Sequence, residues 1–532
     1  MKVALLPLVF VSSAAVAQWS NDPADPMVVC NAANEQRFVR AIADADSGYY
    51  VFWSDLRNSP QKADLYGQHF DSEGNELWTA NGELLMSHLT KSVNYMAPLL
   101  MPDGSLIVAF LAGANAYGGD TLKAMRFDED ANALWSEPST LLTGLDHRSL
   151  QLVLSDSCAY LMAYCESCGS GGYGCRMQRV RMDGTVQFPS VGIVATSNYG
   201  PYTVRPDGAG GIIHSIRCGN GAGTCLVAQR FDSLGTAVWP GYINLADGNG
   251  LNYAFATAVD DGANQTAVWE VNGDLRMTQV DTLGSPTWSP AVRIATDLPT
   301  YSQADPSVVV SDDALFVAWS DNRPPAANVD LFLQKYDLAT GAALWATDGI
   351  PVIQMNTFLP RTGMVLSDSG AVVVTQEGNI DGYSAMRVRG DGTLAWSDPT
   401  VLCVPAFNPA NAERVHLPDG NGGLVAFWQT SAGDVYGARV YRNGKRYNDV
   451  GLVETAQRTT IRSYPNPATD VLTLELPADQ HITQVQVING QGQVVEVPFA
   501  GRSLDLSRTA QGCYVALIHT SKGVSTAHFI KN

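Results

Sequence analysis

Acidic side chains come closer to a chemical site than any other residues of this sequence. Asp260-Asp261, Asp312-Asp313 and Asp128-Glu129-Asp130 each bring carboxylates together, and such groups could bind Ca²⁺ or act as acid and base. Each group also lies where a turn between strands is expected, and turn aspartates usually bond their own backbone. The sequence therefore predicts structural aspartates and no cofactor, with a Ca²⁺ site as the alternative.

Catalytic motifs are missing from the sequence. It contains no Gly-x-Ser-x-Gly elbow, His-Glu-x-x-His helix, phosphate loop or dinucleotide fingerprint. The eight histidines show no ligand spacing, and His69 and His214 fall within expected strands, which favours a structural role. We therefore assign no catalytic, cofactor-binding or metal residue. The two carboxylates of a glycosidase can lie far apart in sequence, so an enzyme remains the alternative.

Cysteines form two regularly spaced pairs. Cys168 with Cys175 and Cys218 with Cys225 flank glycine-rich segments of equal length, which predicts a disulfide across each of two hairpin loops. Cys165 and Cys168 also resemble half of a zinc ribbon, but no second half follows. Nine cysteines indicate an oxidising compartment. The remaining cysteines have no assigned partner: Cys30, Cys158, Cys165, Cys403 and Cys513.

Composition indicates the fold class and excludes some partners. Charged residues make up 16% of the 532 residues, while Gly (49), Trp (11) and Tyr (20) are plentiful, and helical periodicity is hard to find. These features are typical of an all-β protein. A formal net charge of -19 makes nucleic acid and anionic membranes unsuitable partners.

The N-terminus is typical of a secretory signal peptide. Lys2 supplies the positive charge, Val3–Val11 the apolar segment and Ala15-Val16-Ala17 a small-x-small cleavage site. We expect residues 1–17 to be removed by cleavage between Ala17 and Gln18. No later stretch approaches ~18 unbroken apolar residues, so the sequence predicts no transmembrane segment.

A unit of roughly 50 residues recurs along most of the chain. In its first copy, the apolar strand Tyr49–Trp53 and the strand Leu65–Phe70 are followed by an Asp-x-x-Gly turn ending at Gly74 and by Trp78. Eight copies can be aligned, the last degenerate at Gly444. We expect the aromatic after each turn to pack between neighbouring units. These aromatics are Trp78, Trp135, Phe188, Trp239, Trp288, Trp345 and Trp396.

Units of this length with about four short strands predict a β-propeller over residues 18–453. Eight copies indicate eight blades, with seven as the alternative if the first or last copy is irregular. Met27–Cys30 resembles Thr400–Cys403, the outermost strand of an earlier unit. The N-terminus is therefore expected to add the outer strand of the last blade and close the ring, which removes exposed sheet edges.

Two units share an extended motif, Trp53-Ser54-Asp55-Leu56-Arg57 and Trp319-Ser320-Asp321-Asn322-Arg323. Asp and Arg two positions apart on a strand lie on one face. The motif therefore predicts an ion pair that braces the hairpin, with a substrate-facing arginine as the alternative.

The last 70 residues read as a separate module after a polar linker at 454–462. Alternating strands and Gly/Asn turns predict a small β-sandwich over residues 463–532. Its motifs are a Tyr-Pro-Asn-Pro opening, an Asn-Gly-x-Gly turn, a Gly-x-Tyr strand start and a terminal lysine. The residues concerned are Tyr464, Pro465, Asn466, Pro467, Gly490, Gly492, Gly512, Tyr514 and Lys531.

These motifs strongly resemble the C-terminal sorting domain of type IX secretion cargo (type A, the Por secretion tail) of Bacteroidetes-type bacteria. The resemblance implies Sec export to the periplasm, passage through the outer-membrane translocon and recognition by its sorting protease. The repeats resemble sialidase-like and related β-propellers more weakly. The sialidase Asp-box, Ser-x-Asp-x-Gly-x-x-Thr-Trp, is not met, so sialidase activity is not implied.

The sequence therefore predicts an exported β-propeller, released or held at the cell surface, that binds an extracellular glycan or protein through its loop-rich face without catalysis. The alternative is a secreted polysaccharide hydrolase or lyase with its site at the mouth of the propeller channel. Neither the ligand nor the fate of the tail after export follows from the residues.

Overall fold

The computed structural model divides into two compact units, Met1–Tyr447 and Asn448–Asn532. It describes residues 19–532 except 88–90, 115–118, 166–173, 197–199, 221–222, 249–250, 296–301, 312, 324–328, 355–360, 369–371, 379–381, 447–461, 477–480, 490–493 and 521–522. Ala17 and Gln18, the predicted cleavage site, lie outside the described residues, as do Gly490 and Gly492 of the predicted sorting motif.

The first unit consists of antiparallel sheets, nearly all of four strands, built from consecutive segments of chain. Among the described residues, this unit also contains one short 3₁₀ helix, η2 (Pro405–Phe407). The first two repeats contain β2 (Gln36–Ala43), β3 (Tyr49–Asp55), β4 (Asp64–Phe70), β5 (Glu83–Met86), β6 (Ser92–Leu100), β7 (Leu106–Gly113) and β8 (Gly119–Phe127). The next two contain β9 (Ser139–Ser155), β10 (Cys158–Cys165), β11 (Gly174–Val180), β12 (Ile193–Thr196), β13 (Tyr202–Pro206), β14 (Ile212–Asn220), β15 (Gly223–Phe231) and β16 (Ile243–Gly248).

The later repeats continue the same order. The fifth and sixth contain β17 (Leu251–Val259), β18 (Gln265–Val271), β19 (Asp274–Val280), β20 (Val292–Arg293), β21 (Gln303–Val310), β22 (Ala314–Asp321), β23 (Asp330–Asp337) and β24 (Ile350–Ile353). The last two contain β25 (Arg361–Leu366), β26 (Val372–Gly378), β27 (Gly382–Val388), β28 (Thr400–Cys403), β29 (Pro409–Pro418), β30 (Leu424–Thr430) and β31 (Val435–Val440).

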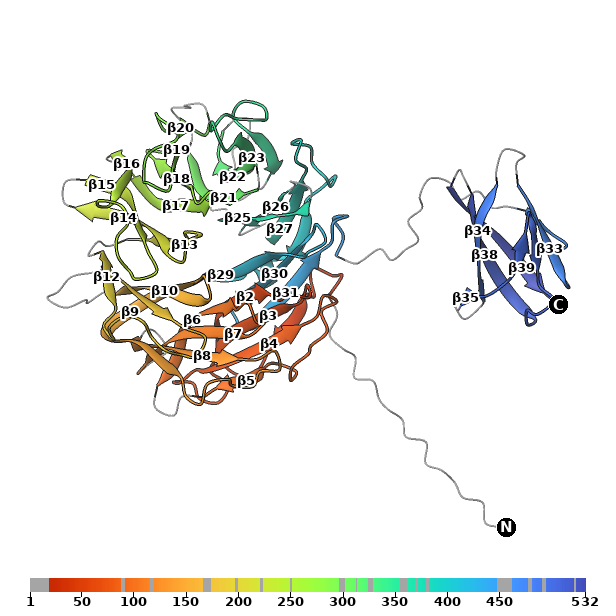
Figure 1. Ribbon diagram of the computed structural model, residues 1–532, viewed down its shortest axis with the longest axis horizontal. Helices are drawn as coiled ribbons and strands as arrows, with labels where there is room; N and C mark the ends of the chain where they lie inside the picture. Colours follow the sequence, from red (N-terminus) through yellow and green to blue (C-terminus); the bar gives the residue numbers. More distant parts are fainter. Residues whose placement is uncertain are drawn as a thin grey trace, which may run out of the picture. The chain divides into compact units, whose positions relative to one another are not determined.

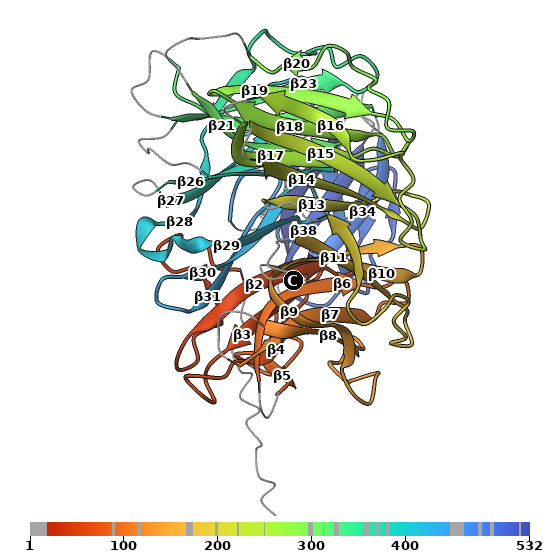
Figure 2. The same cartoon turned by 90° about the vertical axis from the view of Figure 1, so that its left-hand side faces the viewer.

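The sheets form a ring with the first strand of each repeat innermost (Figures 1 and 2). Neighbouring first strands contact one another in a closed cycle, β2, β6, β9, β13, β17, β21, β25, β29 and back to β2. Strand β9 runs without a break from the outer edge of one repeat into the centre of the next, which merges two repeats into one seven-stranded sheet. The all-β propeller predicted from the repeats is therefore the observed fold.

The chain closes the ring with its N-terminus. Strand β1 (Met27–Cys30) pairs antiparallel with β31 and completes the sheet β1-β31-β30-β29, with Met27 opposite Gly437. The predicted addition of an outer strand to the last repeat is confirmed. Because β1 covers the edge of β31, that edge is not available to other chains.

Indole groups join most repeats to the next. The exceptions are Phe188, which has no N–H group, and Trp288, whose buried Nε1 has no hydrogen-bond partner among the described residues. Trp239 Nε1 donates to the carbonyl oxygen of Thr282, in the Asp-x-x-Gly turn of the following repeat, at 3.0 Å. The same bond, at 2.9–3.2 Å, is made from Trp78, Trp135, Trp345 and Trp396 to Glu129, Met182, Gly390 and Arg442. Trp19 makes it to Ser72 at 3.0 Å and so joins the N-terminus to the first repeat. The sequence pattern missed Trp19, because no turn precedes it.

The turn residue above each indole is nearly always glycine. Gly284 has φ +82°, and a Cβ there would lie 3.1 Å from Trp239 Cδ2. The second repeat instead has Ala131, at φ +68°. A left-handed backbone is unfavourable for residues other than glycine, so close contact with the indole and backbone conformation both favour glycine in this turn.

The second unit contains two four-stranded sheets that share one hydrophobic cluster. Leu472 and Leu474 come from the first sheet, and Ala516 and Phe529 from the second. The first sheet has the order β32 (Arg462–Tyr464), β33 (Val471–Glu475), β37 (Ser503–Asp505), β36 (Phe499–Ala500). The second has the order β35 (Val494–Val495), β34 (Ile482–Asn489), β38 (Gly512–Thr520), β39 (Gly523–Lys531).

A histidine is fully buried in the fourth repeat. His214 Nδ1 lies 3.0 Å from the hydroxyl of Tyr242, which itself donates to the carbonyl of Ala195. The Nδ1 atom must therefore carry the proton, and the buried Nε2 has no partner. Burial lowers the pKa of His214 from 6.5 to about 3. This histidine stays neutral in the folded protein.

Substitution of the turn glycine should destabilise the protein. We expect Gly284→Ala to lower the free energy of unfolding by about 1–2 kcal/mol, because the new Cβ meets Trp239 and the backbone is left-handed. Ala131→Gly is the matched control and should leave stability unchanged or raise it by up to about 1 kcal/mol. Urea unfolding of the two variants checks this, and equal losses in both would contradict it.

His214 should make the protein less stable in mild acid. Its folded pKa lies below its unfolded pKa, so the unfolded chain takes up the proton first as the pH falls below about 6.5. We expect His214 to remove about 2 kcal/mol of unfolding free energy between pH 7 and pH 5. Unfolding of the wild type and of His214→Gln at both pH values measures this difference; a variant that keeps the full pH dependence would refute the assignment.

Candidate functional site

The turn between the first and second strands of each repeat lies near the axis of the ring, and we call it the rim turn. In the fourth repeat, Asp207 Oδ1 accepts the backbone N–H groups of Ala209 and Gly211 at 2.9 and 2.7 Å. Its Oδ2 accepts from Arg230 Nε at 2.9 Å. Asp207 is 2% exposed, so its carboxylate is fully used in holding the turn and the neighbouring strand.

The same ion pair recurs around the ring. The other pairs of rim aspartate and third-strand arginine are Asp103 with Arg126, Asp156 with Arg179, Asp368 with Arg387 and Asp419 with Arg439. Although burial opposes ionisation, hydrogen bonds from Ser105 and the charge of Arg126 lower the pKa of Asp103. Arg387 lowers the pKa of Asp368 in the same way, again against burial. These two carboxylates are ionised at neutral pH and cannot donate a proton.

Three consecutive repeats form a pocket at their rim turns. It has a volume of about 520 Å³, and Val259, Val310 and Leu366, at the ends of the first strands β17, β21 and β25, give it an apolar part. Its polar groups are Asp260, Asp261, Ser311, Asp313, Lys335 and Ser367. We call it the rim pocket.

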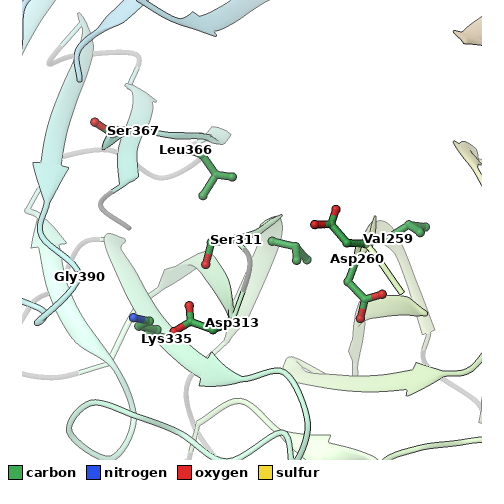
Figure 3. Close-up of a pocket in the computed structure, with 10 residues that line it drawn as sticks. Val259, Asp260, Ser311, Asp313, Lys335, Leu366, Ser367 and Gly390 are labelled. Carbon is green, nitrogen blue, oxygen red and sulfur yellow. The ribbon is translucent and has the colours of Figure 1, made fainter. Parts of the chain in front are cut away.

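The charged groups of the rim pocket lie on opposite sides of it. Figure 3 shows Lys335 and Asp313 together, with Asp260 across from them. Asp260 is held by its own turn, where its Oδ1 accepts the backbone N–H of Asn264 at 2.8 Å. Asp313 is exposed, so it is available to a ligand. Apolar side chains beside carboxylates and an ammonium suit a polar, uncharged ligand.

The sequence placed two of these acidic groups in turns but did not bring them together. Asp312 lies outside the described residues, while Asp260 and Asp313 line one pocket. Lys335 was not identified from the sequence, although it occupies the position at which most repeats have the third-strand arginine that pairs with the rim aspartate. Among the described residues, no group of three or more His, Cys, Asp or Glu side chains could hold a metal ion. No described helix has the length and apolarity needed to cross a membrane.

One predicted disulfide is present and one is wrong. Cys218 and Cys225 are bonded and stand directly opposite each other in β14 and β15, with Cα atoms 5.0 Å apart. Cys175 is instead a buried free thiol. The strand register places it opposite Tyr164, four residues before Cys168 along the chain. Equal spacing in sequence therefore does not give equal pairing; Cys168 itself lies outside the described residues.

The two extended motifs brace their own hairpins. Asp55 Oδ2 accepts from Trp53 Nε1 and from Arg57, both at 2.7 Å, and the guanidinium of Arg57 lies over the Tyr66 ring. The equivalent aspartate of the sixth repeat, Asp321, accepts from the indole and the guanidinium of its own motif in the same way. The predicted ion pair is confirmed.

The sorting motif fastens the start of the second unit to its last strand. Asn466 Nδ2 donates to the carbonyl of His528 at 3.0 Å, and Asn466 Oδ1 accepts the N–H of Ile530 at 2.9 Å. Lys531 forms a parallel bridge with Ala468. Of the remaining motif residues, Tyr514 stacks on Phe529 and bonds the Ala510 carbonyl, Gly512 begins β38, and Tyr464 is exposed beside Pro465 and Pro467.

Several solved structures are similar to the chain at low identity. A prolyl endopeptidase is 14% identical over 74% of this chain and 55% of its own, with a TM-score of 0.41. The BP39L lectin from Burkholderia pseudomallei is 13% identical, covering 77% and 97%, with a TM-score of 0.41. The β-propeller domain of the Trilobed protease from Pyrococcus furiosus is 9% identical, covering 71% and 100%, with a TM-score of 0.37. The chain spans about half the length of the endopeptidase.

These identities are too low to transfer a ligand or a reaction. A comparison with curated proteins finds no match. Residues 462–532 match the family model of the secretion system C-terminal sorting domain. The matched segment begins with β32, the first strand of the second unit, and ends at Asn532. Residues 462–532 are therefore a type IX secretion C-terminal sorting domain, and the protein is exported to the cell surface or the extracellular space.

Proposed function

We propose that the exported protein is a non-catalytic β-propeller that binds an extracellular glycan or protein at its rim turns. Residues 1–17 would be removed as a signal peptide, and residues 18–453 would form eight blades, with the seven-stranded sheet counting as two. Residues 454–462 would link the ring to a β-sandwich formed by residues 463–532. This β-sandwich would be recognised by the translocon of a Bacteroidetes-type outer membrane and by its sorting protease.

The observation that carries this proposal is the use of the rim carboxylates. Asp207 and Asp419 are almost completely buried, and each is bonded to its own turn and to an arginine. A carboxylate that is buried and bonded within the fold in this way braces the ring and is not free to approach the glycosidic bond of a substrate. This supports a rigid binding ring.

The rim pocket is the proposed ligand site. Its apolar side chains, from Val259, Val310 and Leu366, can contact the carbon face of a sugar ring. Asp313 and Lys335 can bond the hydroxyl groups of the sugar. The same groups favour one alternative, a polysaccharide hydrolase or lyase, because Asp260, Asp313 and Lys335 converge on one pocket near the axis.

A panel of extracellular polysaccharides should separate these functions. We expect the exported chain to be retained on at least one polysaccharide without releasing new sugar ends. Asp313→Asn with Lys335→Ala should weaken retention about tenfold or more, because charged hydrogen bonds contribute about 1.5–3 kcal/mol each. Lys123→Ala, in another repeat, is the control. New sugar ends that disappear in the double variant would show an enzyme, and no retention would redirect the search to protein ligands.

The sorting domain should be sufficient for export. Fusing Ser463–Asn532 to a periplasmic reporter in a bacterium with type IX secretion should move the reporter to the cell surface or medium. Asn466→Ala in the fusion should reduce this export, because it removes both bonds to the last strand. Immunoblots of the periplasm, the cell surface and the medium measure where the reporter is. A reporter that stays in the periplasm would contradict export by this domain.

A further inference from the structure

In four repeats one arginine reaches across to the next repeat, and we call it the clasp arginine. It is the last residue but one of the third strand. In the fourth repeat, Arg230 bonds its rim aspartate, Asp207, and its Nη1 donates to the Thr282 carbonyl at 3.1 Å. The carbonyls of Met182, Ser233 and Ser72 accept the equivalent bonds from Arg126, Arg179 and Arg439.

The first repeat has a histidine at this position. His69 Nε2 lies 2.8 Å from Asp44 Oδ2, the rim aspartate, and the imidazole stacks on Tyr50 with ring centroids 3.9 Å apart. The equivalent carbonyl of the next repeat, Glu129 O, accepts from Trp78 Nε1 at 2.9 Å. No hydrogen bond joins His69 to Glu129 among the described residues, because the imidazole is shorter than the arginine side chain.

A pocket of about 430 Å³ lies where the guanidinium would otherwise reach. The pocket is lined by His69, by the rim turn of the first repeat and by Trp78. Residues of a turn in the second repeat complete the lining. The acidic residues of this lining are Asp44, Asp46, Asp71, Glu129 and Asp130. We call it the first-repeat pocket. The corresponding pocket of the third repeat is lined by Arg179 and Arg181 together with Asp156 and Asp183, so it lacks the acidic excess of the first-repeat pocket.

The first-repeat pocket has a strongly negative field. Burial, followed by the charges of Asp44, Glu129 and Asp130, raises the pKa of Tyr50 to about 12. The same field favours a positive group placed between these carboxylates and the aromatic faces. Four other repeats show which group such surroundings hold: a guanidinium bonded to the rim aspartate and to the next turn carbonyl.

We propose that the first-repeat pocket binds a guanidinium group of another molecule, such as an arginine side chain of an extracellular polypeptide. The guanidinium bonds Asp44 and the Glu129 carbonyl, where the clasp arginine bonds in other repeats, and stacks beside Trp78. Guanidinium is suited to this role because it offers several donors in one plane and stays charged. The first-repeat pocket and the rim pocket share no lining residue, so the two binding proposals can be tested independently.

Calorimetric titration of the full exported chain with N-acetyl-arginine amide tests the proposal. The neutral isostere N-acetyl-citrulline amide is the matched probe and should bind about tenfold more weakly or worse, because it lacks the charge. His69→Arg should weaken binding of the arginine probe by at least about tenfold, since the chain then fills the pocket with its own guanidinium. This variant restores the residue of the other repeats, so the fold should persist.

A second pair of variants keeps the test independent of folding. Glu129→Gln with Asp130→Asn changes exposed side chains of the pocket and should weaken binding severalfold. Asp183→Asn at the third-repeat pocket should leave binding unchanged. Equal binding of the two probes, binding that survives His69→Arg, or no binding of the arginine probe would overturn the proposal.

Discussion

The joints of the ring depend on one backbone carbonyl in the turn that follows the third strand of a repeat. In the turns of Ser72, Met182 and Thr282, this oxygen accepts both the indole N–H and the guanidinium of the preceding repeat. Two donors converge on one acceptor in these turns because the backbone comes close to the indole face, where Gly74, Gly184 and Gly284 leave room for it. The glycine, the tryptophan and the arginine therefore form one structural unit. Its contacts always involve two neighbouring repeats.

This unit also explains why a functional surface can form at the rim turns. The arginine neutralises the buried rim aspartate, and the indole fills the space between sheets. Where the arginine is replaced, as by His69 or Lys335, the rim turns border a pocket with uncancelled acidic groups. Departures from the repeat are thus the places where the ring offers chemistry to a ligand.

Patterns that repeat along the chain made the fold predictable, and contacts between repeats made the site difficult to predict. The period, the turns and the similarity of Met27–Cys30 to an outer strand led to the propeller and its closure. Trp19 lacks a turn before it, so the pattern could not include it. Cys168 and Cys175 have the spacing of a disulfide, but the register of β10 and β11 places Tyr164 opposite Cys175, whose thiol is free. The rim pocket combines three repeats, and no single stretch of sequence contains it.

Closure by Trp19 and β1 makes the order of synthesis matter. Trp19 bonds Ser72 and β1 pairs with β31, which ends at Val440. A chain emerges N-terminus first, so β1 must wait unpaired until nearly the whole ring has been made. Any product truncated before β31 keeps an open sheet edge, which aggregates or attracts proteases. The sorting domain follows immediately, so only chains long enough to complete the ring also carry the address for export.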